Sequence, residues 1–194
     1  MNGMTSRSLF FYSATFAKGE PIAYLMSSYR KRQWSSLKNL EDLQLKRLKE
    51  ILSFSSNNSD FYKGRFNDYR IDLECIESLE DLKKIPTISK ADLIDSLDSI
   101  SGTKAHVFSS SKTTGGSTGQ PVKLYKNPLA LARERCATAR SYEWAGVRVG
   151  DPQLRFWGVP HSRTASRRAA LADFVANRKR ISAFDLSERS FLEY

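Results

Sequence analysis

The sequence is poor in the residues that build metal centres and disulfide frameworks. Its 194 residues include two cysteines and two histidines. Cys75 and Cys136 form neither a metal-binding pattern nor a disulfide framework. Without a cluster of histidine, cysteine and carboxylate side chains, the sequence does not support a zinc site. We interpret Cys136, which falls on the apolar face of an expected helix, as a packing residue.

Long apolar runs are also missing. The run Leu9–Tyr12 is too short for a signal peptide or a membrane span, and Glu20-Pro21 closes this region. We therefore expect a cytoplasmic protein with no membrane span. A hydrophobic content of 40% with 11% aromatic residues is typical of a globular protein.

Acidic residues are scarce relative to basic ones. The chain has 21 acidic and 31 basic residues, a formal net charge of +10. The densest basic clusters, Arg30–Arg32, Arg167–Arg168 and Arg178–Arg180, could contact nucleic acid or anionic lipid, or could be solvated surfaces. No RNA-binding or helix-turn-helix pattern accompanies them, so we do not expect a nucleic-acid partner. We expect residues 178–180 to follow a helix C-terminus, where cations complement the helix dipole.

The most informative stretch that is present is Ser109–Pro121, which consists almost entirely of small and polar residues. Its glycines permit positive φ angles and close approach to a ligand, and its hydroxyls and amides can donate to phosphate oxygens. We expect strands at Ala105–Phe108 and Pro121–Tyr125 to flank it, forming a hairpin. The candidate nucleotide-binding residues are Thr113, Thr114, Gly115, Gly116, Ser117, Thr118, Gly119 and Lys123.

The residue types in this stretch bear on two other interpretations. It is not a Walker loop, because Gly119 is followed by Gln120 and Pro121 rather than by Lys and Ser or Thr. A flexible Ser/Gly linker would have a similar composition. Lys123 could add a cation to a phosphate site, although strand alternation could also direct it to solvent.

The pattern of helices and strands predicts an α/β protein. Leucines and isoleucines from Leu37 to Leu52 share one side of a helix. Ser78 and Ser89 can each cap a short helix, with an aspartate three residues on. Further along we expect helices at 128–145 and 164–176 and strands at 154–157 and 181–184, arranged as one sheet with crossover helices. The predicted organisation is a mostly helical region over 1–100 and the start of an α/β nucleotide-binding subdomain, apparently incomplete, over 101–194.

Residues 114–121, Thr-Gly-Gly-Ser-Thr-Gly-Gln-Pro, resemble the phosphate loop of the adenylate-forming (AMP-dependent) synthetases. Segments 44–52, 60–66 and 79–93 resemble the opening of the phenylacetate–CoA ligase family, and within it the CapK-type proteins of capsular polysaccharide biosynthesis. The order of these segments also matches. Gln120 departs from the lysine that is usual in the loop, which removes a cation.

The resemblance implies an ATP-dependent ligase that forms an acyl-adenylate from a carboxylate, with Mg²⁺ as a cofactor and coenzyme A as a possible acceptor. It also implies that this chain corresponds to the N-terminal portion of such an enzyme and is inactive by itself, with a partner chain as one possible source of the remaining catalytic parts. His161 is a candidate for the acyl pocket, whereas His106 is interpreted as a residue on the face of a strand. The alternatives are a non-catalytic nucleotide-binding module, or a basic protein that binds nucleic acid or a membrane surface.

Overall fold

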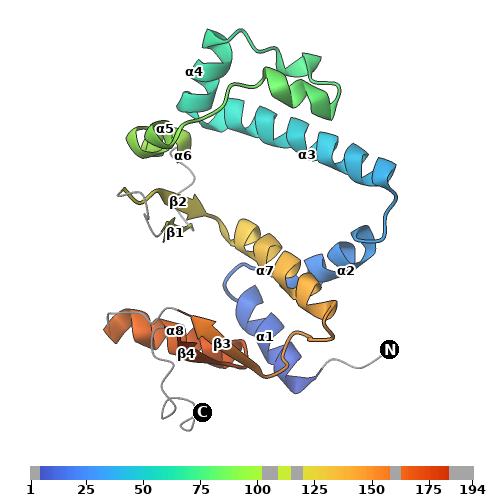
Figure 1. The fold of residues 1–194 in the computed structure, drawn as a ribbon, viewed down its shortest axis with the longest axis vertical. Helices are drawn as coiled ribbons and strands as arrows, with labels where there is room; N and C mark the ends of the chain where they lie inside the picture. The colour runs from blue at the N-terminus through green and yellow to red at the C-terminus, as the bar shows by residue number, and fades with distance from the viewer. Residues whose placement is uncertain (1–4, 102–108, 115–119, 158–162, 184–194) are drawn as a thin grey trace. The chain divides into compact units, whose positions relative to one another are not determined.

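The computed structural model describes residues 5–101, 109–114, 120–157 and 163–183 (Figure 1). It is a mixed α/β structure, mostly helical, with two small sheets. The chain forms two compact units, one made of Met1–Tyr29 together with Ala132–Tyr194 and the other of Arg30–Leu131. All the secondary structure described between residues 5 and 101 is helical, as expected, but the division into units crosses the boundary predicted near residue 100.

The unit formed by Arg30–Leu131 is mainly helical. Its elements are α3 (Leu37–Asn58), α4 (Asp60–Asp68), η1 (Leu73–Cys75), η2 (Leu79–Lys84), α5 (Lys90–Asp95), α6 (Leu97–Ser101), β1 (Ser110–Thr113) and β2 (Lys123–Lys126). Leu52, Phe66 and Ile76 form the buried core. The predicted apolar side of α3 is confirmed in part: Leu52 is buried and Leu45 and Leu48 pack against this core, whereas Leu37 and Ile51 are exposed.

The ends of these helices follow the predicted capping chemistry. The Asp81 carboxylate accepts hydrogen bonds from the Ser78 N–H and hydroxyl at 2.8 Å each, and Asp92 accepts the same pair from Ser89 at 2.8 Å. Ser59 ends α3 and begins α4, and its hydroxyl also donates to the carbonyl of Ser99 in α6 at 2.8 Å. Short polar side chains thus set where each short helix begins.

The second unit combines an N-terminal and a C-terminal part of the chain. It contains α1 (Ser6–Phe16), most of α2 (Ile22–Arg32), most of α7 (Pro128–Glu143), β3 (Gln153–Trp157), α8 (Arg163–Val175) and β4 (Arg178–Ser182). Its core joins Ile22 and Met26 of α2 to Ala132 and Cys136 of α7. The Cys136 thiol lies 3.6 Å from the Ile22 carbonyl and donates to it, which confirms Cys136 as a packing residue.

Helix α7 begins and ends as the sequence predicts. The Asn127 side chain accepts from the N–H of Ala130 at 2.8 Å, immediately before Pro128. At the other end, Gly146 has a φ of +79°, and Val147 and Gly146 donate to the carbonyls of Tyr142 and Glu143. This pair of bonds around a left-handed glycine is the Schellman arrangement that closes a helix.

Two expectations about the strands need correction: the described strands do not form one sheet, and residues 178–180 belong to the last of them. β3 and β4 are parallel and joined by α8, as expected for a crossover unit, but β1 and β2 form a separate antiparallel sheet. The single sheet predicted from alternation is therefore not formed by the described strands, because alternation along the chain does not determine which strands pair. Arg178 and Arg180 follow α8, as predicted, but as residues of β4, and both contact Asp173 of α8 at 2.5 and 3.0 Å.

Within the described ranges, no helix is both long enough and apolar enough to cross a membrane.

Candidate functional site

The candidate site is the β1–β2 hairpin, whose first strand lies within the Ser109–Pro121 stretch and whose second strand follows it. The strands pair in antiparallel register, with Thr113 opposite Lys123 and Ser110 opposite Lys126. β2 also lies against α6. The sequence predicts a hairpin but places residues 110–113 in its loop, whereas in the structure they form β1. They can form a strand because ladder hydrogen bonds use the backbone, so small polar side chains do not prevent pairing.

Thr114 closes the hairpin where the glycine-rich stretch begins. Its N–H donates to the carbonyl of Val122, and its Oγ1 accepts from the N–H of Val122, both at 2.9 Å. Val122 is buried, which fixes this end of β2. The two ends of segment 115–121 are therefore joined by a backbone bond and a side-chain bond.

The same contacts determine which further hydrogen bonds the Thr114 hydroxyl can make. A threonine hydroxyl has one proton to donate and two lone pairs. The bond from Val122 uses a lone pair, so the proton can be directed toward an external acceptor such as a phosphate oxygen. Thr113 and Thr114 are both exposed, which leaves them accessible to a ligand.

The hairpin carries positive charge on both strands, from Lys112, Lys123 and Lys126. Lys123 is exposed, and its Nζ lies 5.1 Å from the centre of the Tyr125 ring. A hydrogen bond with Tyr125 and the charge of that group raise the pKa of Lys123, and Asp98 adds to the effect. Lys123 is therefore a cation at neutral pH, and it lies opposite Thr113 at the end of the ladder next to Thr114.

Other predicted site residues lie outside the described ranges. These are Gly115, Gly116, Ser117, Thr118, Gly119, His106 and His161, together with the strand expected at Ala105–Phe108. The structure places three of the candidate nucleotide-binding residues, Thr113, Thr114 and Lys123, and it brings them together at one end of the hairpin.

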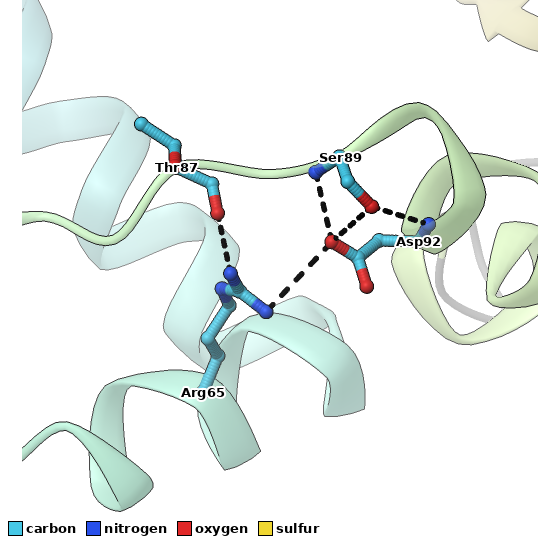
Figure 2. Close-up of polar contacts among 4 residues, drawn as sticks. All are labelled: Arg65, Thr87, Ser89 and Asp92. Atoms are coloured by element: carbon cyan, nitrogen blue, oxygen red, sulfur yellow. Dashed lines mark hydrogen bonds and ion pairs between the residues drawn. The ribbon is translucent and has the colours of Figure 1, made fainter.

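The sequence interpretation missed the role of Arg65. Figure 2 shows its guanidinium between the Thr87 carbonyl, to which Nη2 donates, and the Asp92 carboxylate, 4.0 Å from Nη1. Arg65 also lies over the rings of Phe61 and Tyr69, at 5.7 and 5.5 Å from their centres. These contacts join segments 60–66 and 79–93, both of which carry the family resemblance. Aromatic residues four positions before and after an arginine on a helix could have signalled this cluster.

Asp92 has a low pKa for a structural reason. Hydrogen bonds from the Ser89 N–H and hydroxyl are the main cause of the lowered pKa, and Arg65 adds an attractive charge. The Asp92 carboxylate is ionised, and it already accepts hydrogen bonds from Ser89 and pairs with Arg65. Its role is therefore structural. We therefore assign Arg65 and Asp92 a structural role in the unit that also contains the hairpin, and we do not include them in the candidate site.

Comparison with known proteins found no family model and no curated protein that matches this chain.

Proposed function

We propose that this chain is the N-terminal part of an ATP-dependent, carboxylate-activating ligase and that the β1–β2 hairpin binds the polyphosphate of ATP. The observation that supports this most directly is the pair of hydrogen bonds between Thr114 and Val122. These bonds join the residues on either side of segment 115–121, and they leave the proton of the Thr114 hydroxyl available to donate. Adjacent cations and accessible backbone amides are what a polyphosphate requires.

Each described residue has a distinct part in this proposal. Thr114 donates its hydroxyl proton to a phosphate oxygen while its oxygen keeps the hairpin closed. Thr113 offers a second hydroxyl, and Lys123 offers a charge opposite to that of the phosphates. A hydrogen bond to a charged group contributes about 1.5–3 kcal/mol, whereas an exposed lysine is screened by water and contributes less.

Mg²⁺ accompanies ATP in the enzymes that the chain resembles. Within the described ranges, no three Asp, Glu, His or Cys side chains gather as metal ligands. We therefore assign Mg²⁺ to the nucleotide phosphates rather than to a protein cage in this part of the chain, and coenzyme A remains a possible acceptor on the strength of the resemblance.

The proposed reaction joins a carboxylate oxygen to the α-phosphorus of ATP and releases pyrophosphate, giving an acyl-adenylate. A carboxylate is already ionised at pH 7, so this step needs no general base. The hairpin's part is to hold the β- and γ-phosphates, so that the charge that develops on the departing pyrophosphate is met by fixed donors.

The first test is calorimetric titration of the chain with Mg-ATP, tripolyphosphate and adenosine. We expect the two polyphosphates to bind and adenosine not to bind. Thr114→Val removes the hydroxyl with little change of shape and should weaken ATP binding about 10- to 100-fold, while Thr114→Ser should retain most of it. Because Thr114→Val also removes the bond from Val122, thermal unfolding of each variant shows whether the hairpin's unit is still folded.

A matched pair of lysine variants isolates the charge. Lys123→Gln should weaken Mg-ATP binding a few-fold, and Lys46→Gln, which removes an exposed cation from α3, should leave it unchanged. Equal effects of the two substitutions, or binding of adenosine as strong as that of ATP, would contradict the assignment. Exchange of labelled pyrophosphate into ATP with a panel of carboxylic acids then separates ligase chemistry from nucleotide binding alone.

A further inference from the structure

The turn between α2 and α3 carries cations and large apolar side chains that packing does not explain. Trp34 is 80% exposed and Leu37 is 71% exposed. Lys31, Arg32 and Lys38 lie within four residues of Trp34 along the chain. We call these five residues the α2–α3 patch, and all of them belong to the unit formed by Arg30–Leu131.

The turn holds these residues close together. The Trp34 N–H donates to the Lys31 carbonyl at 3.2 Å, and the Ser35 N–H donates to the Arg32 carbonyl at 3.0 Å. Ser36 then caps α3, its hydroxyl oxygen accepting from the N–H of Asn39 at 3.3 Å. The backbone is thus ordered from the end of α2 to the first turn of α3, and the patch is short and continuous.

The segment that contains the patch carries positive charge alone, and the exposed acidic residues Glu41 and Asp42 follow it within α3. Residues 21–40 include no Asp or Glu. The nearest acidic residue on the N-terminal side, Glu20, is buried and paired with Arg135 at 3.1 Å. Cations at the end of α2 complement its dipole, but Lys38 lies in the first turn of α3, where a helix favours acidic residues. The helix dipole therefore accounts for Lys31 and Arg32 but not for Lys38.

We propose that the α2–α3 patch docks on an anionic lipid surface. Cations attract a negatively charged leaflet, and an exposed tryptophan three residues before an exposed leucine is suited to the boundary between headgroups and acyl chains. Leu37 is the residue that favours lipid over nucleic acid, because an aliphatic side chain gains free energy in acyl chains and has no stacking surface to offer a base. The proposal is independent of the ATP-binding hairpin.

The test is co-sedimentation of the full chain with vesicles of phosphatidylcholine alone and with added phosphatidylglycerol. We expect binding only to the anionic vesicles, with a blue shift and quenching of tryptophan fluorescence by brominated lipid. Trp34→Ala should weaken the partition roughly tenfold. Trp144→Ala, which removes another exposed tryptophan, should not weaken it.

Charge is tested by two triple variants that remove the same number of cations. Substituting Lys31, Arg32 and Lys38 by Gln should weaken vesicle binding by about fivefold per cation, roughly a hundredfold together. Substituting the exposed Lys46, Lys49 and Lys63 by Gln should weaken it far less. Trp34→Ala serves as the second variant if the patch triple fails to fold, since so exposed a side chain contributes little to stability.

Several outcomes would overturn the proposal. These are absence of binding to anionic vesicles, equal binding to neutral vesicles, and equal loss in the two triple variants. Patch-dependent binding to DNA or RNA without binding to vesicles would assign the surface to nucleic acid instead.

Discussion

The two compact units differ in how far apart in the sequence their core residues lie. In the unit of Arg30–Leu131, Leu52, Phe66 and Ile76 come from consecutive elements. In the other unit, Ile22 contacts Cys136, 114 positions away. The first core can form from neighbouring helices, whereas the second cannot form until the chain has closed a long loop, at a cost in chain entropy. Local sequence rules therefore describe the first unit better than the second.

The largest expected effect is that of Phe66→Ala, because Phe66 is 4% exposed at the centre of the local core. We expect a loss of about 3–5 kcal/mol in the free energy of unfolding. In hydrogen exchange, protection should fall across residues 45–85 and persist in α2 and α7. Phe54→Ala, at a 62% exposed position of α3, is the control and should change stability by about 0.5 kcal/mol or less.

Met26→Ala tests the long-range core. Met26 is 1% exposed, and its truncation should cost about 2–5 kcal/mol. Because Met26 packs with Ala132 and Cys136, exchange should accelerate in α2 and α7 together. Tyr24→Ala, at an exposed position of α2, is the matched control. Faster exchange in α2 with α7 unchanged would show that this core does not join the two segments.

Arg65→Ala should destabilise the helical unit by a smaller amount, about 1 kcal/mol, because it removes the hydrogen bond to the Thr87 carbonyl and the contacts with the rings of Phe61 and Tyr69. Arg65→Lys should not restore stability, since a lysine cannot make the same forked contacts or stack between the two rings. Urea unfolding measures both variants. Arg47→Ala breaks the exposed Arg47–Glu50 pair on α3 and should cost clearly less; an equal cost would mean that Arg65 acts only as a surface charge.

The smallest expected effect is a pH dependence at Glu20. Burial raises the pKa of Glu20 above its ordinary value, against the opposing charges of Arg135 and Lys18. The folded state therefore binds the proton more tightly than the unfolded state. This contribution to stability is present below the unfolded pKa and is lost as the pH rises through the folded pKa. Glu20→Gln should remove it, so that the variant gains stability relative to the wild type as the pH increases from acid to neutral.

Thermal unfolding from about pH 3 to pH 7 measures this difference, the lower limit lying below the ordinary pKa of a glutamate. Arg135→Gln removes the nearest cation and should move the loss of stability to higher pH. A constant difference between Glu20→Gln and the wild type at every pH would contradict the assignment.

Much of the local structure could be predicted from the sequence because its causes lie within a few residues. Ser78 with Asp81, Ser89 with Asp92, Asn127 before Pro128, and Gly146 after α7 each act on their own helix end. The hairpin was also predictable, but its register was not. Thr113 faces Lys123 and Thr114 closes against Val122 because of backbone pairing, which small polar side chains such as those of Ser110 and Ser111 do not specify.

The sequence by itself determined the helical character of the described residues 5–101, the helix ends and the β3–α8–β4 crossover, since these follow from side-chain chemistry acting over short distances. Only the tertiary structure decided that α2 packs with α7, that β1–β2 and β3–β4 are separate sheets, and that Arg65 joins two distant segments. These contacts depend on which surfaces meet after the chain has folded back on itself, and periodicity along the chain carries no information about that choice.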